Sequence, residues 1–274
     1  MSKIAVFGGT GFIGGTFCRL YSQKVNIIPK QSIEFDTKEV LYFISTTTNQ
    51  NVFNDLHIDI NTNLNFLMDV LSNCKDKDIT FNFISSCFVY GNDIIDAKET
   101  DNCNPTGFYS VTKRCAEQLL ISFCKTFNIK YRILRIGNVY GLDKTISLKK
   151  NVLAHIIKQL KKNEDVHLYD NGDYLKDYMF VEDVCKAIEI ILEFGHHNEI
   201  YNIASGTSNN FKYIIETAKS ITNSHSKLIS VPIPTNQQYI QIKNMTLNID
   251  KLKSLKFEPQ INFKYGLHML CNML

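Results

Sequence analysis

The chain has 274 residues and a formal net charge of only +3, and hydrophobic residues make up 44% of it. This length and composition predict a globular protein with a sizeable core, formed as one large domain or as a domain with a smaller lobe. The small net charge, without a long block of like charges, argues against nucleic acid as a partner, and no apolar run is long enough to span a bilayer.

Cysteine usage and the N-terminal sequence indicate the cellular compartment. The eight cysteines are scattered and form no Cys-x-x-Cys pair, which predicts reduced thiols and no disulfide framework or zinc site. The chain enters an apolar run at Ile4 with no signal-peptide pattern before it. We therefore expect a cytoplasmic protein that binds neither a membrane nor a structural metal.

The first predicted strand, residues 3–7, runs into a glycine-rich turn and an apolar-periodic helix that ends near Tyr21. Strand, glycine turn and helix in this order are the context of a dinucleotide-binding fingerprint. Gly8 permits the tight turn, Gly11 lets the backbone approach a pyrophosphate, and Gly14 allows close helix packing. The free amides at the helix start would face the phosphates. The predicted cofactor-binding residues of the turn are Gly8, Gly11, Phe12, Ile13 and Gly14.

The second predicted strand, Val25 to Ile28, is followed by Pro29 and Lys30. In a site for NAD, an Asp or Glu near this point binds the ribose 2′-hydroxyl. The nearest acid here is Glu34, several residues further on. Lys30 would instead suit the 2′-phosphate of NADP, or it is a solvated lysine at a strand end, and the sequence leaves both interpretations open.

A third strand is predicted over residues 39–45 and a helix over about residues 53–74. We expect the apolar stripe of that helix to lie in the core, and it consists of Leu56, Ile60, Leu64, Leu67 and Leu71. Beside the stripe, Asn61 and Asn63 are expected to be surface amides unless a family resemblance gives one of them a role.

The fourth predicted strand, Thr80 to Ile84, leads into Ser85 and Ser86. Ligands of open α/β sheets bind at the carboxyl ends of the strands. Hydroxyl groups at this position are candidates to hydrogen-bond a substrate carbonyl, although two serines at a strand end can also be a simple turn. Residues 92–107 are predicted to be a polar loop.

A helix predicted over residues 108–123 carries Tyr109 and Lys113, which stand four residues apart and share one face. A phenol has an unperturbed pKa of about 10. We expect the Lys113 ammonium to lower the pKa of Tyr109, which would make the pair a proton-transfer device. The alternative is a half-buried tyrosine beside a solvated lysine, because this spacing also arises by chance.

The chain continues with a strand over residues 130–136, and after residue 141 the alternation of strands and helices loosens. About eight strands alternating with helices predict an α/β protein, a Rossmann-type doubly wound parallel sheet with a smaller C-terminal substrate-binding lobe. We assign residues 1–145 and parts of 177–204 to the dinucleotide-binding domain, and residues 146–176 and 205–274 to the lobe. The later predicted elements are helices near 152–160, 181–192, 211–221 and 262–274 and strands at 166–169, 199–204 and 227–231.

Five motifs in a fixed order cover nearly the whole chain. They are Gly8-x-x-Gly11-x-x-Gly14, Ser85-Ser86-x-x-Val89-Tyr90-Gly91, Pro105-x-x-x-Tyr109-x-x-x-Lys113, Leu134-Arg135-x-x-Asn138-Val139-Tyr140-Gly141 and Asp177-Tyr178-x-x-Val181-x-Asp183-Val184. In this set the chain resembles the extended short-chain dehydrogenase/reductase family of NAD(P)-dependent nucleotide-sugar epimerases, dehydratases and reductases.

The resemblance implies a role for each matching residue. Ser86 would hold the sugar oxygen, Tyr109 would transfer the proton, and Lys113 would tune Tyr109 and bind the nicotinamide ribose. Further cofactor contacts are implied for Phe43, Ser45, Asn61, Ile84 and Ile136. Substrate contacts are implied for Ser86, Cys87, Asn138 and Lys176, with the region 145–180 around the last of these.

Departures from the family pattern narrow the expected activity. Dehydratases of the family carry an Asp-Glu pair directly after the catalytic hydroxyl residue, where this chain has Cys87 and Phe88. The segment before Val40 is short and lacks the acids that relatives use near the ribose and the adenine. The arginine pair that relatives present to the diphosphate is also absent, and the available substitutes are Lys149, Lys150, Lys176 and Lys243.

These features predict an NADPH-dependent reductase of a keto group on a nucleotide-linked sugar. The sugar we expect is a 4-keto-6-deoxy hexose used for surface polysaccharide. NADP(H) is preferred over NAD(H), because a released cofactor needs fewer adenine contacts than one held through a whole epimerase cycle. The alternatives are an NAD-dependent epimerase and a non-catalytic dinucleotide sensor. The resemblance also implies a homodimer through the helices near 53–74 and 108–126.

Overall fold

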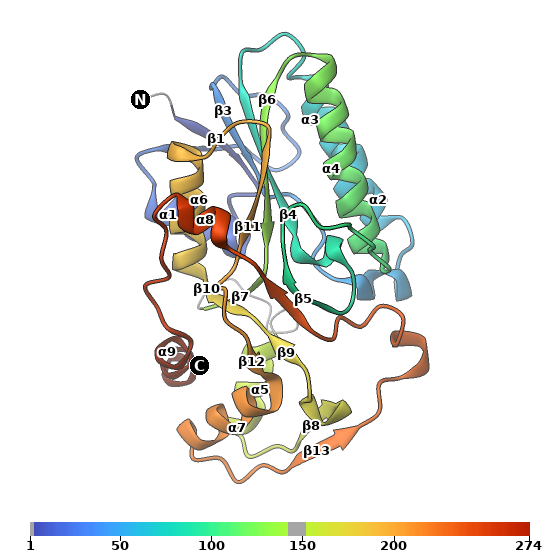
Figure 1. Cartoon of the computed structure of the whole chain (residues 1–274), viewed down its shortest axis with the longest axis vertical. Coiled ribbons are helices and arrows are strands. Elements are labelled where there is room, and N and C mark those ends of the chain that lie inside the picture. The colour runs from blue at the N-terminus through green and yellow to red at the C-terminus, as the bar shows by residue number, and fades with distance from the viewer. Residues whose placement is uncertain (1–2, 142–151) are drawn as a thin grey trace.

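The computed structural model describes residues 3–141 and 152–274, and its centre is a six-stranded parallel sheet (Figure 1). The strands lie in the order β11-β6-β4-β3-β1-β2, and each neighbouring pair is parallel. The chain passes from β1 to β2 on one side and returns to β3 on the other, so the topological switch point lies between β1 and β3. The predicted doubly wound fold is confirmed. The strands are β1 (Ile4–Phe7), β2 (Val25–Ile27), β3 (Glu39–Tyr42), β4 (Thr80–Ser86), β6 (Lys130–Ile136) and β11 (Glu199–Ile203).

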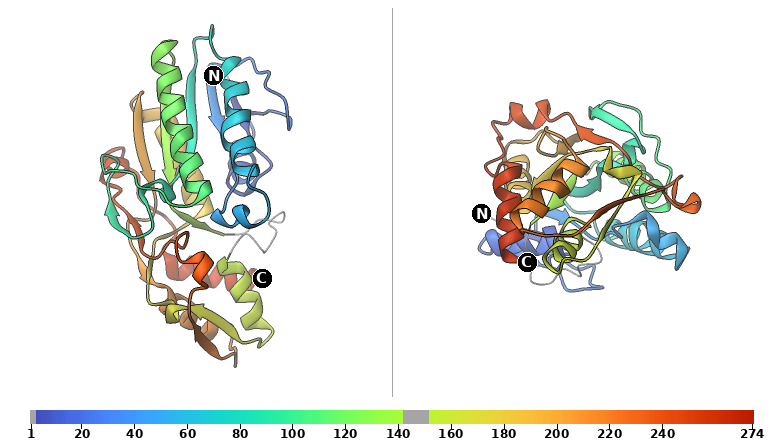
Figure 2. Two further views of the ribbon diagram at one scale, coloured as in Figure 1. Left: turned by 90° about the vertical axis from the view of Figure 1, so that its right-hand side faces the viewer. Right: turned by 90° about the horizontal axis from the view of Figure 1, so that it is seen from below.

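Helices cover both faces of the sheet (Figures 1 and 2). Helices α1 (Phe12–Leu20) and α6 (Val181–Phe194) pack together in one hydrophobic core, and α3 (Phe66–Ser72) and α4 (Phe108–Thr126) pack in the other. Every residue of β4 is buried, as expected for a central strand that is covered on both faces.

A smaller lobe with its own core lies beyond the carboxyl ends of the strands, at the bottom of Figure 1. Leu153, Ile157, Ile214 and Leu267 are fully buried in it. A short parallel sheet of two strands covers this core. The lobe contains α5 (Val152–Lys161), β8 (Val166–Tyr169), α7 (Phe211–Ile221), β13 (Leu228–Val231) and α9 (Phe263–Met273), close to the bounds that the periodicity predicts.

Short strands between the sheet and the lobe were not predicted. The expected polar loop 92–107 contains β5, which pairs with β14 about 150 residues later in the chain. Two to four residues are too few to show a period, and the partner strands are too far apart in sequence to be recognised. These strands are β5 (Ile94–Ala97), β7 (Asn138–Tyr140), β9 (Leu175–Lys176), β10 (Tyr178–Phe180), β12 (Asn209–Asn210) and β14 (Met245–Leu247).

The helix predicted over residues 53–74 is shorter than expected, with helical residues from 58 to 72, and it is not a regular α-helix throughout. The segment is divided into η1 (Asn49–Phe53), α2 (Ile58–Ile60), a π-helical turn η2 (Asn61–Asn65) and α3. A π turn inserts an extra residue into the helix, so the residues before the turn are rotated relative to the residues after it. Ile60, which directly precedes this turn, is 40% exposed, and Leu56, which lies outside the helix, is 55% exposed, although both were expected in the core. Leu67 and Leu71 are buried as predicted.

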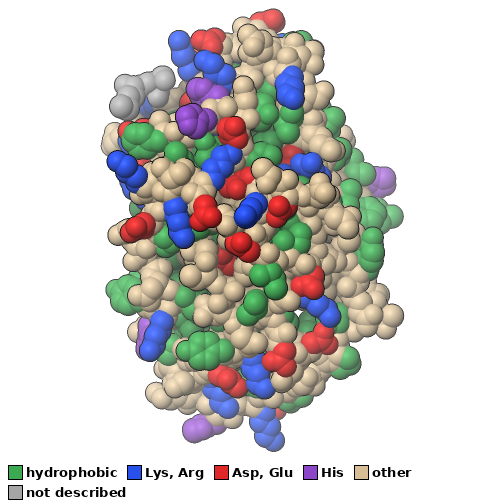
Figure 3. Space-filling view, viewed as in Figure 1, with side chains coloured by type: hydrophobic (Ala, Val, Ile, Leu, Met, Phe, Trp, Pro, Cys, Tyr) green, Lys and Arg blue, Asp and Glu red, His purple; other side chains and the backbone are tan. Residues whose placement is uncertain are grey.

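The surface has mixed charge, with Lys and Arg side chains interspersed among Asp and Glu on the face in Figure 3. That face shows no basic stripe of the kind that nucleic-acid binding requires. Across residues 3–141 and 152–274, the helices are all too short or too polar to cross a lipid bilayer.

Candidate active site

The glycine turn lies at the switch point of the sheet, between the end of β1 and the start of α1. Gly8 has a φ of +80°, a backbone conformation that residues other than glycine rarely adopt. A Cβ on Gly14 would lie 2.4 Å from the Gly8 carbonyl oxygen, so the first turn of α1 is seated directly on the strand end. Gly11 precedes α1 without any side-chain cap. The turn thus offers a bare helix start to an anion, and this fits a dinucleotide pyrophosphate.

The other predicted cofactor residues surround this turn at the strand ends. Phe43 lies against the glycine turn, since a Cβ on Gly8 would be 3.1 Å from the Phe43 Cβ. Ile84 and Ile136 are buried near the ends of β4 and β6. Lys30 is exposed just beyond β2, and residues 28–38 contain no strand. The structure therefore leaves a lysine, and no carboxylate, next to the end of the second strand.

Ser86, Tyr109 and Lys113 come together at the end of β4 and the start of α4. Ser86 is the last residue of β4, and all three side chains are buried. Burial raises the pKa of Tyr109 to about 12, while side-chain hydrogen bonds with Ser86 and Ser45 oppose this rise. The ring of Phe88 meets the Tyr109 ring edge-on, with 6.0 Å between centroids. The phenol is thus held in its neutral form between two hydroxyl groups.

Lys113 is not the group that sets the pKa of Tyr109, contrary to the prediction from the sequence. Its Nζ donates a hydrogen bond of 2.6 Å to the carbonyl of Ile84 and lies 4.1 Å from the centre of the Phe83 ring. Burial lowers the pKa of Lys113 to about 7, and the negative charge of Glu117 opposes this shift. The prediction that the ammonium lowers the pKa of Tyr109 is therefore wrong, because burial is the largest influence on the pKa of both groups.

The two neighbouring asparagines, both expected at the surface from the sequence, differ in burial. Asn61 is exposed and accepts a hydrogen bond from Asn65, and its cofactor contact, which the resemblance implies, stays a prediction. Asn63, expected at the surface, is buried. Its side-chain oxygen accepts hydrogen bonds from the Ser45 hydroxyl and the Thr46 backbone N–H. Its side-chain nitrogen donates to the hydroxyls of Thr46 and Thr112, and all four bonds are 2.8–3.0 Å long. Asn63 thereby ties the loop after β3 to the helix that carries Tyr109.

Replacing Asn63 with alanine should lower the free energy of unfolding by about 2–3 kcal/mol, because it leaves buried donors and acceptors without partners. The measurement is chemical denaturation of the purified variant. Asn61→Ala is the matched control, with an expected change within about 0.5 kcal/mol. A large loss of cofactor affinity in Asn61→Ala would support the predicted cofactor contact of Asn61.

Asn49 is a further residue that the sequence did not single out. It lies on η1, yet its Oδ1 accepts hydrogen bonds from the backbone and side chain of Ser110 in the first turn of α4. A Cβ on Gly107 would lie 2.1 Å from Asn49 Cγ, so a glycine is needed there. Because Gly107 has no side chain to cap α4, Asn49 supplies that cap from another segment.

The predicted substrate residues lie on the side of the site that faces the lobe. Cys87 follows Ser86 and is buried, and its thiol lies close enough to Lys176 for the two groups to interact. Lys176 Nζ donates to the Ile242 carbonyl at 2.8 Å. Burial lowers the pKa of Lys176 to about 8. Asn138 donates to the backbone carbonyl of Asp177 at 3.1 Å.

Other candidate lysines are not brought to the site. Lys243 lies at the surface, where its Nζ is 3.6 Å from an Asp170 carboxylate oxygen. Lys149 and Lys150 lie outside the described residues. Among these candidate lysines, Lys176 is the one that the described part of the chain places close to Cys87, the residue after Ser86.

Comparison with known proteins identifies the family. The model of the NAD dependent epimerase/dehydratase family matches residues 30–204, more than half of the chain. The chain belongs to this family. The family predicted from the five motifs is confirmed, and the matched residues include Ser86, Tyr109 and Lys113.

Several relatives are similar over most of the chain. A putative UDP-glucose 4-epimerase of Methanocaldococcus jannaschii is 26% identical over 68% of this chain and 59% of its own length. The dTDP-4-dehydro-6-deoxyglucose reductase of Escherichia coli is 27% identical over 78% of this chain and 69% of its own length. The chain therefore spans about three fifths to two thirds of these two relatives.

Solved structures show the same fold. UDP-glucose 4-epimerase of Thermotoga maritima, solved with UDP-glucose, matches this chain with a TM-score of 0.88 at 23% identity. The match covers 98% of this chain and 97% of the epimerase chain. RMD of Pseudomonas aeruginosa, complexed with NADPH, has a TM-score of 0.85 at 20% identity and covers 99% and 98%. Nicotinamide cofactors of both kinds, NAD and NADPH, occur on this fold.

Proposed function

We propose that this protein reduces a keto group of a nucleotide-linked sugar, with NADPH as the hydride donor. The observation that carries the proposal is the arrangement of Ser86, Tyr109 and Lys113, which are buried together where β4 ends and α4 begins, with Cys87 and no carboxylate directly after Ser86. Carbonyl reduction needs a neutral acid that keeps its proton until negative charge develops on the substrate oxygen.

The residues of the site divide the work of reduction. When bound, the nicotinamide supplies a hydride to the carbonyl carbon. The Ser86 hydroxyl donates a hydrogen bond to the carbonyl oxygen, and Tyr109 gives its proton to the same oxygen as the carbonyl becomes an alcohol. The positive charge of Lys113 stabilises the phenolate that remains. Cofactor contacts would come from the glycine turn, Lys113 and the apolar side chains Phe43, Ile84 and Ile136.

The substrate proposal is a nucleotide-linked 4-keto-6-deoxy hexose of the kind used for surface polysaccharide. The similarity to the dTDP-4-dehydro-6-deoxyglucose reductase supports it, as does the buried Cys87 where elimination would need a carboxylate. The test is NADPH oxidation, followed at 340 nm in the presence of a panel of such sugars. Turnover of at least one of them is expected.

An NAD-dependent epimerase is the second candidate, favoured by the similarity to the putative UDP-glucose 4-epimerase. It predicts NAD retained through purification and interconversion of UDP-sugars without net cofactor turnover. Finding both results, together with no oxidation of NADPH, would overturn the reductase.

Lys30 tests the choice of cofactor. Lys30→Ala should weaken NADPH binding about tenfold and NADH binding hardly at all, because only NADPH carries the 2′-phosphate. Fluorescence titration of the purified protein with each cofactor measures both affinities. Lys38→Ala, an exposed lysine before β3, is the control for a general effect of charge. Equal losses for NADPH and NADH would make Lys30 a solvated lysine without a role in binding.

We extend the proposal to the organisation of the protein. Residues 1–145 and parts of 177–204 would hold the dinucleotide, and residues 146–176 and 205–274 the nucleotide-sugar, which the separate core of the lobe supports. A homodimer is proposed through α4 and the segment before α3, where Phe53, Leu56 and Val111 are about half exposed. The eight free thiols fit a cytoplasmic enzyme.

A further inference from the structure

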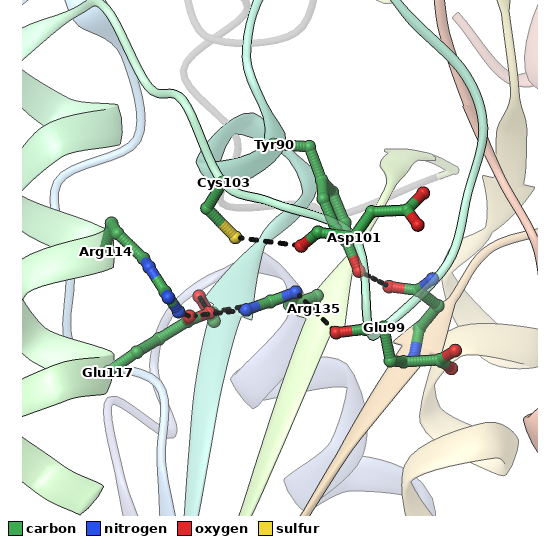
Figure 4. A network of polar contacts seen from close by, with 9 residues as sticks. Tyr90, Glu99, Asp101, Cys103, Arg114, Glu117 and Arg135 are labelled. Carbon is green, nitrogen blue, oxygen red and sulfur yellow. Dashed lines mark hydrogen bonds and ion pairs between the residues drawn. The ribbon is translucent and has the colours of Figure 1, made fainter.

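A buried cluster of charged side chains lies directly behind the catalytic residues. Glu117, on α4, is completely buried. Its carboxylate accepts two hydrogen bonds from Arg135, at 3.0 and 2.8 Å, one from Arg114 at 2.8 Å, and one from the Ser85 hydroxyl at 2.6 Å. Figure 4 shows Arg114 and Glu117 extending from α4 toward Arg135 on the sheet.

Further contacts fix the arginine at the centre of this cluster. Arg135 lies 4.7 Å from the centre of the Tyr90 ring and donates to the Glu99 carbonyl at 3.4 Å. The Tyr90 hydroxyl in turn donates to Asn202 on β11. The cluster therefore joins α4 to three adjacent strands of the sheet. Burying so many charges is costly, and a cluster this far from solvent must be fully paired to be tolerated.

The cluster lies close to each catalytic group in the chain, one residue from Ser86, about one helical turn from Lys113 and about two turns from Tyr109. Glu117 follows Lys113 by four residues and Tyr109 by eight, so the three side chains lie along one face of α4. Ser85, which Glu117 binds, directly precedes Ser86 at the end of β4. We propose that Glu117 is a positioning residue of the active site, which fixes α4 against β4 through Ser85 and Arg135 and faces the Lys113 ammonium with a buried negative charge.

The inference rests on the proposed function for the role of Lys113 in catalysis. The groups around Lys113 are the Ile84 carbonyl and the Phe83 ring on β4, with Glu117 on its own helix. Around Tyr109 lie Ser45, Ser86 and Cys87, with the Asp59 carboxylate near enough to act on it. Among these groups, Glu117 is the one whose charge opposes the loss of the Lys113 proton.

The first test is Glu117→Gln, which keeps the shape of the side chain and removes its charge. Lys113 should then titrate at a pH about one unit lower, because an opposite charge within a few ångströms has been removed. Carbon-13 NMR of labelled lysine side chains measures this ionisation without any substrate. In activity assays, kcat should fall at least tenfold, and the decline of kcat at alkaline pH should move about one pH unit lower, as the Lys113 titration does. The affinity for NADPH should change less than twofold.

The matched control is Glu39→Gln. Glu39 accepts hydrogen bonds from Arg132 and Asn82 at the opposite, N-terminal end of the strands. This variant removes the same charge from a similar ion pair, and it should leave the Lys113 titration and the pH profile unchanged. An equal effect of Glu39→Gln and Glu117→Gln would reduce Glu117 to a stabilising ion pair and overturn the proposal.

A second variant keeps the test decisive if Glu117→Gln does not fold. The Arg114 side chain is 28% exposed, and Arg114→Gln leaves the Arg135 pair intact. It removes a positive charge from the cluster, so Lys113 should titrate at higher pH, opposite in sign to Glu117→Gln. An unmoved Lys113 titration in Arg114→Gln contradicts the proposal, whereas failure of every keto-sugar assay alone would contradict only the proposed function.

Discussion

Replacing Tyr109 with phenylalanine should lower kcat by about 10²- to 10⁴-fold, the range that a positioned proton donor contributes. The affinity for NADPH should stay within about twofold, because the substitution removes one hydroxyl and little binding surface. The hydroxyl that is lost interacts with the side chains of Ser86 and Ser45. The measurement is steady-state turnover with the best substrate, together with a fluorescence titration of cofactor.

Tyr201→Phe serves as the control for Tyr109→Phe. Tyr201 is also buried, but its hydroxyl accepts a hydrogen bond from the His196 amide at the far side of β11. It should lose some stability and keep its turnover. Near-full activity in Tyr109→Phe would show that another group donates the proton, and the mechanism proposed here would then be wrong.

The five sequence motifs, found in a fixed order along the chain, were sufficient to predict the family, the fold and the proximity of Ser86, Tyr109 and Lys113. Each of these depends on local spacing: a glycine turn after a strand, hydroxyls at a strand end, and two side chains four apart on a helix. Such patterns are visible in sequence because the residues that make them are neighbours in the chain. The strand order then brings the local patterns to one edge of the sheet.

The errors arose where distant segments or burial decide the outcome. Asn63 is buried because a π turn rotates it inward, and its partners Ser45 and Thr112 lie 18 and 49 residues away. Glu117 shares a helix face with Lys113, but its importance comes from Arg135 and Ser85 on two strands. The pKa of Tyr109 rises because of burial, and burial is a property of the fold and not of the Tyr-x-x-x-Lys spacing.

The glycine turn gives the second prediction with a large effect. Gly14→Ala should weaken binding of NADPH and of NADH alike by about 10- to 100-fold, the equivalent of the 1–3 kcal/mol that overpacking costs. The added Cβ would lie 2.4 Å from the Gly8 carbonyl oxygen, which is backbone and cannot turn aside as a side chain would. Relief of the clash requires α1 to move away from the end of β1, and this displaces the amides that are expected to face the pyrophosphate. Titration with both cofactors measures the loss.

The next glycine of the same helix is the matched control. A Cβ on Gly15 would meet the Gly9 carbonyl oxygen at 3.5 Å, an ordinary van der Waals contact. Gly15→Ala should therefore leave cofactor affinity unchanged and raise the free energy of unfolding by about 0.5–1 kcal/mol, because alanine favours the helix. The two substitutions lie at adjacent positions, yet only Gly14→Ala is expected to weaken cofactor binding. If Gly14→Ala binds NADPH as tightly as Gly15→Ala, the close seating of α1 on the turn is not what holds the dinucleotide, and the pyrophosphate must be bound elsewhere.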